Sequence, residues 1–337
     1  MTGVQVLIEL EDPSGVAEAR HRAGVLAGAA KLDATAAGEL AIAVTEAAGN
    51  IVKHAGRGKV LLRTLERGKH AGVEALALDQ GPGMTSIAGS MRDGHSTAGS
   101  PGTGLGALQR LTTGLEIWSK PGKGTVLRFE VWPKGAIVGP PAGFSLGAVN
   151  VPKPGETECG DDWAVVETPG GLVLFVVDGL GHGPDAANAA HAAVRAAVKH
   201  AAMKPGEILD AVHAALASTR GAAAAVALLD PRKELCIFSG VGNIAACILH
   251  DGNTRNMVSH NGILGHQVRK VQEFQYPFRP GALLLAHSDG LATRWDLGSY
   301  PGLEMRHPAL VAAVLYRDFV RGRDDVTVVA LRMGTAQ

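Results

Sequence analysis

Apolar residues along the first half of the chain alternate between helical and strand spacing. Helices are predicted over residues 14–30, 34–54 and 105–112, and strands over 4–10, 59–65 and 73–79, followed by two closing strands. Asp33 is a suitable N-cap for the second helix, and Gly56 lies just past its end. These signals predict an α/β domain.

The second half is richer in strands. The predicted strands are 163–167, 172–178, 223–229, 234–240, 245–250, 282–287 and 326–332, and the predicted helices are 185–200 and 205–218. Such a pattern predicts stacked sheets with helices outside them. Between the halves, residues 133–144 contain three prolines and three glycines, which neither a helix nor a central strand can accommodate. We therefore predict domains over 1–134 and 145–337, joined by a linker over 135–144.

Composition narrows the classes of partner. Hydrophobic residues make up 46% of the 337 residues and charged residues 19%, which predicts folded rather than disordered domains. Lys+Arg and Asp+Glu both total 32, so the basic surface typical of nucleic-acid binding is not expected. The sequence holds no apolar run near the ~18 residues of a membrane span, and its three cysteines lack metal-ligand spacing. We expect a soluble, cytoplasmic protein with neither nucleic acid nor membrane as a partner.

Three polar or glycine-rich segments occur in order in the first half. Glu46 and Asn50 lie four residues apart on one face of the long helix, where a carboxylate and a carboxamide can serve as general base and Mg²⁺ ligand. Asp79 ends a strand and opens the sequence Asp-Gln-Gly-Pro-Gly. Residues 102–106, Gly-Thr-Gly-Leu-Gly, open a helix whose free N–H groups favour phosphate. Taken singly, the first segment is also typical of a solvated helix face, the second of a turn and the third of a surface loop.

Together, these segments resemble the N, G1 and G2 boxes of the GHKL ATPases over about residues 4–133, with Gly124-Thr125 matching the closing element. The resemblance implies a Bergerat α/β sandwich that binds ATP and Mg²⁺. It implies that Glu46 activates the attacking hydroxyl, Asn50 holds Mg²⁺ and Asp79 reads adenine. The remaining implied pocket residues are Gly81, Gly83, Gly102, Thr103, Gly104, Leu105, Gly106 and Thr125. Residues 46–58 and 115–125 look closer to RsbT-type serine kinases than to RsbW-type anti-sigma kinases.

Aspartates in the second half stand beside predicted strands. Asp161 precedes one strand, Asp178 ends the apolar run 172–177, Asp289 follows the run 282–287, and Asp324 precedes the last strand. Any one of them is explained by a turn. Four in this order indicate a site for hard divalent cations, because buried carboxylates need compensating charge.

The order G-D, D-G-x-G-H-G, S-D-G and D-D-x-T resembles the metal-dependent PPM phosphatases of the SpoIIE branch, with the RsbX type nearest in size, over about residues 144–333. The resemblance implies an αββα sandwich with two Mn²⁺ or Mg²⁺ ions. Asp178 would bridge the ions with help from the Gly179 carbonyl, and Asp289 and Asp324 would complete the second site. Asp161 would be a ligand or an anchor, with Asp162 as a substitute, and Asp325 would lie outside the ligand set. His182 would be either a general acid or a residue that holds its turn, and no arginine is assigned to the substrate phosphate.

The two resemblances together imply a bifunctional regulator of a bacterial partner-switching pathway in the stress response. It would phosphorylate and dephosphorylate Ser/Thr of STAS-domain anti-sigma antagonists or stressosome-type proteins. The alternative is that the N-terminal half senses nucleotide, or binds a sigma factor or downstream phosphatase, and controls an active phosphatase only. A purely structural scaffold is disfavoured, because it has no need of positioned acidic groups beside glycine-rich loops.

Overall fold

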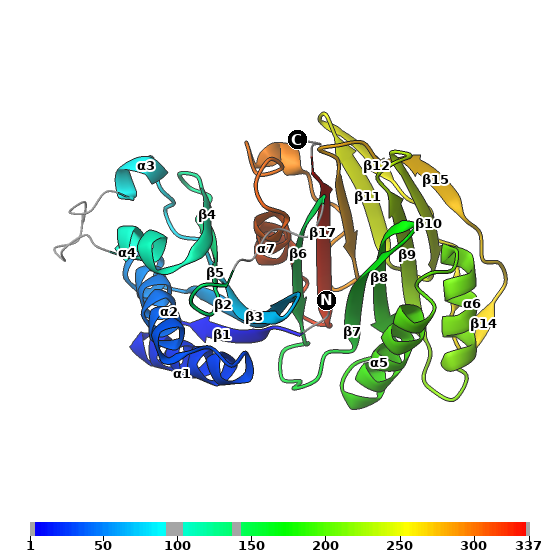
Figure 1. The fold of residues 1–337 in the computed structure, drawn as a ribbon, viewed down its shortest axis with the longest axis horizontal. Helices are drawn as coiled ribbons and strands as arrows, with labels where there is room; N and C mark the ends of the chain where they lie inside the picture. The colour runs from blue at the N-terminus through cyan, green and yellow to red at the C-terminus, as the bar shows by residue number, and fades with distance from the viewer. Residues whose placement is uncertain (1–3, 92–103, 137–142, 335–337) are drawn as a thin grey trace. The chain divides into compact units, whose positions relative to one another are not determined.

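The computed structural model describes residues 4–91, 104–136 and 143–334 and divides into two compact units (Figure 1). The first unit spans Gln5–Gly139, and the second is formed mainly by Pro140–Gln337. Each unit has its own sheets and its own core, so each is described by itself.

The first unit is a five-stranded antiparallel sheet with helices on one face. The sheet order is β1-β2-β3-β5-β4, and the strands are β1 (Val6–Leu10), β2 (Gly58–Arg67), β3 (His70–Asp79), β4 (Thr113–Ser119) and β5 (Thr125–Val131). The helices are α1 (Pro13–Ala29), α2 (Ala34–Ala55), the one-turn α3 (Ile87–Ser90) and α4 (Gly104–Leu111). Residues of α1 and α2 share a core with Val60, Ala75 and Phe129 of the sheet.

Both ends of α2 are set by the residues that the sequence indicates. The Asp33 carboxylate accepts hydrogen bonds from the N–H groups of Thr35 and Ala36, which satisfies two of the donors left free at a helix start. Gly56 follows the helix with a φ of 77°, a conformation that favours glycine. Both cap predictions are confirmed, and the register of α2 is thereby fixed.

A buried ion network lies on β2, β3 and β5. Glu74 accepts hydrogen bonds from Nε of Arg63 at 2.6 Å and Nε of Arg128 at 2.7 Å. Arg128 also pairs with Glu130, which binds Arg67 and the indole N–H of Trp132. The side chains of Arg63, Glu74 and Arg128 are at most 4% exposed. Buried charges of this kind are tolerated only when paired, so the network specifies how these strands align.

The second unit stacks two five-stranded sheets. The first has the order β15-β10-β9-β8-β7 and the second β12-β11-β16-β17-β6. The strands are β6 (Phe144–Val151), β7 (Asp161–Thr168), β8 (Gly171–Gly179), β9 (Ala222–Asp230), β10 (Leu235–Val241), β11 (Ala245–His250), β12 (Asn253–Asn256), β15 (Phe274–Pro277), β16 (Leu283–His287) and β17 (Val326–Met333). A small hairpin is formed by β13 (Gly262–Ile263) and β14 (Gln267–Val268), and a 3₁₀ turn by η1 (Leu297–Ser299).

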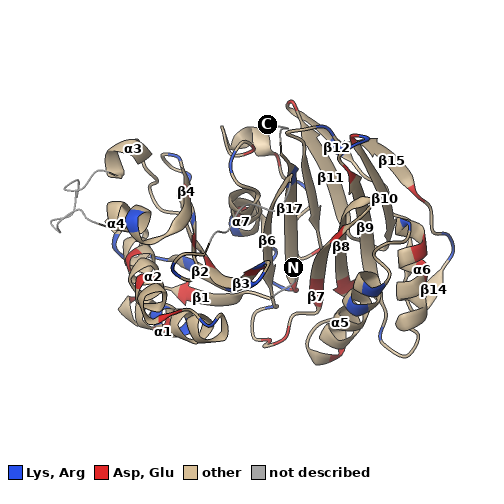
Figure 2. Ribbon diagram, in the orientation of Figure 1, with Lys and Arg blue, Asp and Glu red and all other residues tan. Residues whose placement is uncertain are grey.

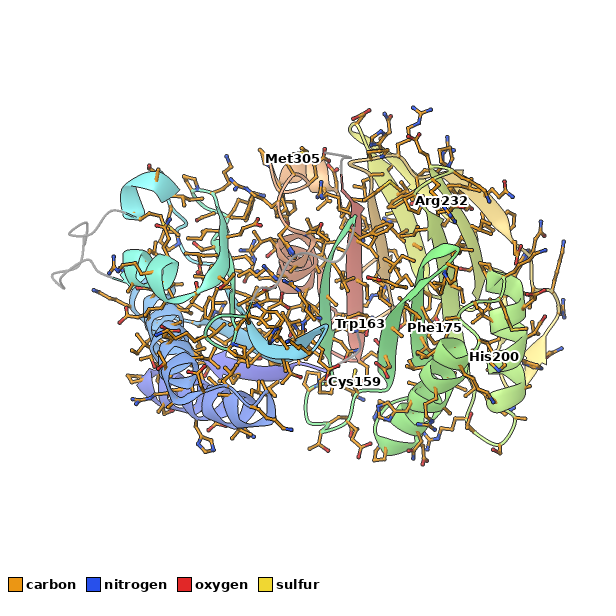
Figure 3. All side chains as sticks on the ribbon, in the orientation of Figure 1. Cys159, Trp163, Phe175, His200, Arg232 and Met305 are labelled. Atoms are coloured by element: carbon orange, nitrogen blue, oxygen red, sulfur yellow. The ribbon has the colours of Figure 1, made fainter. Side chains whose placement is uncertain are left out.

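Helices cover both outer faces of the stacked sheets. Trp163 belongs to the core between the sheets, whereas Phe175 faces α5 (Pro184–Lys199) and α6 (Pro205–Ala215); both are labelled in Figure 3. Alanines dominate the buried face of α5, which lets that helix lie close to the sheet. On the other side, α7 (Pro308–Phe319) packs on β6 and β17. The layers are therefore αββα, and the predicted α/β fold class is confirmed.

Several elements are missing from the sequence prediction, namely β6, β12, β13, β14, β15, α3, η1 and α7. α7 is missing from it because positions 308–316 are all buried, so the segment has no polar face and no helical periodicity. β6 is not predicted, because it follows directly on the Pro- and Gly-rich residues 133–143; it begins at Phe144, the last residue of the predicted linker. No helix within the described residues is long and apolar enough to cross a membrane.

Removing Glu74 should destabilise the first unit. Glu74→Ala leaves Arg63 and Arg128 buried with fewer partners, and we expect a loss of about 3 kcal/mol in the free energy of unfolding. Hydrogen exchange of peptides from β2, β3 and β5, recorded at increasing urea concentration, measures this loss of stability. Glu66→Ala, at an exposed position of β2, is the control and should change the value by less than about 0.5 kcal/mol. Equal values for the two variants would contradict this account of the network.

Candidate functional sites

The structure brings Glu46, Asn50 and Gly104 together. Glu46 and Asn50 are half-buried on α2, and α4 begins against them. A Cβ atom added to Gly104 would lie 3.0 Å from Glu46 Oε2 and 3.4 Å from Asn50 Nδ2. Leu105 packs against the core of the unit and Gly106 is buried, which seats the start of α4 on α2. Gly102 and Thr103 lie outside the described residues.

Asp79 organises a second cluster at the end of β3. Its Oδ1 atom accepts hydrogen bonds from the N–H groups of Gly81 (2.8 Å) and Thr125 (3.2 Å). A Cβ atom added to Gly81 would lie 2.6 Å from the Cβ atom of Ala55, so only glycine lets this loop approach the end of α2. Gly83 has a φ of 71° and packs against the carbonyl of Lys120, which again requires glycine.

Helix α2 connects these clusters. Asn50 belongs to the first cluster and Ala55 contacts the second. Because an α-helix rises about 1.5 Å per residue, these two positions lie about 8 Å apart along α2. One cluster offers a carboxylate and a carboxamide beside a helix N-terminus, and the other offers a carboxylate among glycines. Such an arrangement suits an elongated ligand with a flat polar ring at one end and phosphates at the other. The residues therefore fit a nucleotide with Mg²⁺.

Ser119 is a contributor that sequence reasoning missed. This buried serine donates to the carbonyl of Gly124, accepts from the N–H of Met84 at 2.8 Å and lies 2.9 Å from Thr125 Oγ1. It joins the loop after Asp79 to the turn between β4 and β5. An isolated serine at a strand end carries no sequence signal of this role.

In the second unit, strand pairing places the carboxylates of Asp161 and Asp178 together at the same end of two neighbouring strands. Asp161 begins β7 and Asp178 lies near the end of the antiparallel β8, so the two residues face each other in register. The Gly179 N–H donates to the carbonyl of Gly160 at 2.9 Å, which continues the pairing past the aspartates. Figure 2 shows acidic residues at this end of β7 and β8, near α5.

Asp161 is held inside the sandwich. It is 1% exposed, and its Oδ2 atom accepts a 2.5 Å hydrogen bond from Ser288 Oγ. Ser288 Oγ in turn accepts from the N–H of Thr327, and Asn150 Nδ2 donates to Thr327 Oγ1 and to the Asp161 carbonyl. Burial, and then the charge of Asp178, raise the pKa of Asp161 well above its usual value. These contacts favour an anchoring role for Asp161 over a role as a ligand.

Asp178 faces three other carboxylates. Burial raises the pKa of Asp178 to about 8, with further contributions from Asp289, Asp324 and Asp325. Asp289 accepts from Asn243 Nδ2 at 2.8 Å, and Asp324 accepts from the N–H of Asp325 at 3.0 Å. Like charges gathered in this way are unfavourable unless cations join them.

The carboxylates fit divalent cations, although their side chains do not form a closed cage. Within the described residues, no group of three His, Cys, Asp or Glu side chains is arranged to hold a metal. Mg²⁺ usually keeps several waters and binds one or two carboxylates, so a closed protein cage is not required. Burial and the neighbouring carboxylates raise the pKa of Asp178, and a divalent cation would supply the opposite charge that such a cluster favours.

Remaining residues complete the rim of this cluster. Asp325 is buried, and its Oδ1 atom accepts from the N–H of Lys153, whereas Asp162 accepts from the N–H of Trp163. His182 Nδ1 lies 2.7 Å from Glu156 Oε1, a partner from the loop before β7 that the sequence does not indicate. The pairing fixes the ring and leaves Nε2 directed elsewhere, so both interpretations of His182 stay open.

Comparison with known proteins identifies both units. Residues 10–131 match the model of the histidine kinase-like ATPase domain, and residues 168–334 match that of stage II sporulation protein E (SpoIIE). Serine/threonine-protein kinase RsbT of Bacillus subtilis (strain 168) is 38% identical over 91 residues, which are 27% of this chain and 68% of that protein.

The chain belongs to the RsbT family of histidine kinase-like ATPases, fused to a SpoIIE-type domain.

Solved structures are also similar to this chain. A structure from work on the bacterial stressosome as a modular system for secondary messenger signalling has a TM-score of 0.53 and 31% identity, covering 56% of this chain and 99% of its own. The PP2C phosphatase domain of SpoIIE from Bacillus subtilis, with a fragment of its regulatory domain, has a TM-score of 0.51 and 16% identity and covers 82% of each chain. RsbX in complex with magnesium has a TM-score of 0.50 and 18% identity, covering 58% of this chain and 98% of its own. The last two likenesses show the PP2C fold of the SpoIIE-type domain.

Removing one ionisable group from the carboxylate cluster should stabilise the metal-free protein. Asp178→Asn keeps the shape of the side chain and removes a carboxyl whose ionisation burial and the neighbouring carboxylates oppose in the folded state, so we expect the free energy of unfolding in EDTA at neutral pH to rise by about 1 to 2 kcal/mol. The same variant should lose the stabilisation that Mn²⁺ gives the parent chain. Thermal unfolding with EDTA and with Mn²⁺ measures both effects. If Asp178→Asn were less stable than the parent in EDTA and kept its response to Mn²⁺, the cluster would not be a metal site.

Proposed function

We propose that this chain both adds phosphate to and removes phosphate from Ser/Thr residues of STAS-domain regulatory proteins in a partner-switching pathway. Residues 1–134 would form the kinase domain and residues 145–337 the phosphatase domain. The observation that carries the proposal is the presence of two sites of different chemistry in one chain, one a carboxylate and carboxamide beside a helix N-terminus, the other a cluster of carboxylates.

In the kinase domain, Glu46 would accept the proton of the attacking hydroxyl, and Asn50 would hold Mg²⁺. Asp79 would accept a hydrogen bond from the adenine amine, with Gly81, Gly83 and Thr125 shaping the base pocket. The N–H groups at the start of α4 would receive the phosphates. Bound Mg²⁺ supplies charge neutralisation, so the residues of the chain mainly position the two reactants.

In the phosphatase domain, Asp178, Asp289 and Asp324, with the Gly179 carbonyl, would hold two Mn²⁺ or Mg²⁺ ions. Asp161 would align β7 with β16 and β17 through Ser288 and Thr327. The bound ions supply the Lewis acidity that activates water and neutralises the phosphoryl group. The fold of the SpoIIE-type domain and its carboxylate cluster support this assignment.

The substrate class rests on the relatives. RsbT is a serine/threonine-protein kinase, and the structure with 31% identity comes from work on the stressosome. STAS-domain antagonists or stressosome-type proteins are therefore the proposed substrates, and a sigma factor or a downstream phosphatase is a proposed further partner. The competing proposal is that the ATPase domain only senses nucleotide or binds a partner.

Transfer of label from γ-labelled ATP to a STAS-domain protein tests the kinase half. The Asp178→Asn variant is used as the parent, so that phosphate, once added, stays on the acceptor. Adding Glu46→Gln should lower the rate by about 100-fold or more, because the general base is lost while its shape is kept. Glu39→Gln, two turns earlier on α2, is the matched control and should transfer at the parent rate. ATP binding with no transfer to any STAS-domain acceptor would reject the kinase and favour the nucleotide sensor.

A further inference from the structure

A phosphomonoester dianion that enters the carboxylate cluster needs a cation of its own. Asp178 pairs in register with Asp161, and Asp289 follows the Ser288 that binds Asp161, so carboxylates already gather here and a substrate adds more negative charge. A guanidinium suits this role, because its planar fork binds a phosphate through two parallel hydrogen bonds. Sequence motifs assign no such group.

Arg220 lies beside the loop that follows Asp178. It stands two residues before Ala222, which pairs with Gly179 across β8 and β9. The Leu180 N–H donates to the Gly221 carbonyl at 2.9 Å, which joins the two loops directly. A Cβ atom added to Gly181 would lie 3.2 Å from Arg220 Nη1, so the guanidinium rests against this loop.

The backbone of Arg220 is fixed from both sides. The Gly221 N–H donates to Thr219 Oγ1 at 3.0 Å, and Gly221 has a φ of 83°, which favours glycine. His266 Nε2 lies 2.9 Å from the Arg220 carbonyl. An arginine on a rigid backbone loses less freedom when it binds a ligand than one on a mobile loop.

The guanidinium is oriented but still accessible. Arg220 Nη2 lies 2.8 Å from Asp185 Oδ2, in the first turn of α5, and the Arg220 side chain is 51% exposed. Asp185 therefore holds one nitrogen of the fork, while the other nitrogen lies at Gly181. The group is placed to meet an anion that arrives at the Asp178 loop.

We propose that Arg220 binds the phosphate of the substrate in the SpoIIE-type domain, and that Asp185 positions it. The inference rests on the proposed phosphatase function and supplies the phosphate-binding group that the metal ligands do not provide.

Hydrolysis of p-nitrophenyl phosphate and of a phosphoserine peptide by the full chain with Mn²⁺ tests the role of Arg220. Arg220→Ala should raise KM for both substrates by about 10-fold or more and change kcat far less, because the contact binds the phosphate before and during the reaction. Arg220→Lys should recover part of the loss, since it keeps the charge but not the fork. Asp185→Asn should give a smaller rise in KM.

Arg232→Ala is the matched control. Arg232 is also an exposed arginine paired with an aspartate, but it follows the opposite end of β9 (labelled in Figure 3). The KM of the Arg232→Ala variant should equal that of the parent chain. An unchanged KM in Arg220→Ala, or an equal rise in Arg232→Ala, overturns the proposal.

Calorimetric measurement of inorganic phosphate binding to the Mn²⁺-loaded chain distinguishes a failure of the Arg220 proposal from a failure of the proposed phosphatase activity. If the parent hydrolyses neither substrate but binds phosphate about 10-fold or more tightly than Arg220→Ala does, the role of Arg220 stands and the proposed hydrolysis fails. Hydrolysis by the parent together with equal phosphate binding in both proteins rejects Arg220 and leaves the phosphatase in place.

Discussion

The buried carboxylate of Asp161 joins the two sheets of the SpoIIE-type domain. Asp161 belongs to β7 in one sheet, and its partner Ser288 follows β16 in the other sheet, with Thr327 of β17 and Asn150 of β6 completing the set. An unpaired carboxylate at this depth would be costly, so the hydrogen bonds specify which strand ends meet. Asp178 and Asp289 lie next to members of this network in strand pairing or in sequence. The proposed metal site therefore depends on an interaction that is itself structural.

In the ATPase domain, a single helix, α2, positions the residues of both clusters. The caps at Asp33 and Gly56 fix the register of α2, and α2 then presents Glu46 and Asn50 to α4 and Ala55 to the loop after Asp79. Small residues decide how closely the parts approach, because a Cβ atom at Gly81 would overlap Ala55. The buried ion network around Glu74 aligns β2, β3 and β5, and β3 carries Asp79.

Local signals made most of this arrangement predictable. Caps, strand alternation and glycine-rich loops are read within a few residues, and they indicate most of the helices and sheet strands but not α7, β6, β12 or β15. α7 escapes because burial on all sides removes its periodicity. The roles of Ser119, Asn150 and Arg220 depend on partners distant in sequence, such as Met84, Asp161 and Gly181, and so appear only once the strands are paired. Asp161 was expected as a ligand or an anchor, and its hydrogen bond from Ser288, which itself accepts from Thr327, favours the anchor.

Two opposing reactions in one chain would consume ATP with no net change in phosphorylation if they acted on one acceptor at full rate. The steady-state phosphorylation of that acceptor therefore reports the balance between the two activities. The most direct measurement is the phosphate occupancy of a STAS-domain protein, followed by intact mass spectrometry with ATP, Mg²⁺ and Mn²⁺. We expect Asp178→Asn to drive the occupancy highest, Glu46→Gln to strip acceptor that is already phosphorylated, and the parent chain to settle between them. Identical time courses for the parent and Asp178→Asn, with no loss of phosphate from labelled acceptor, would contradict this expectation.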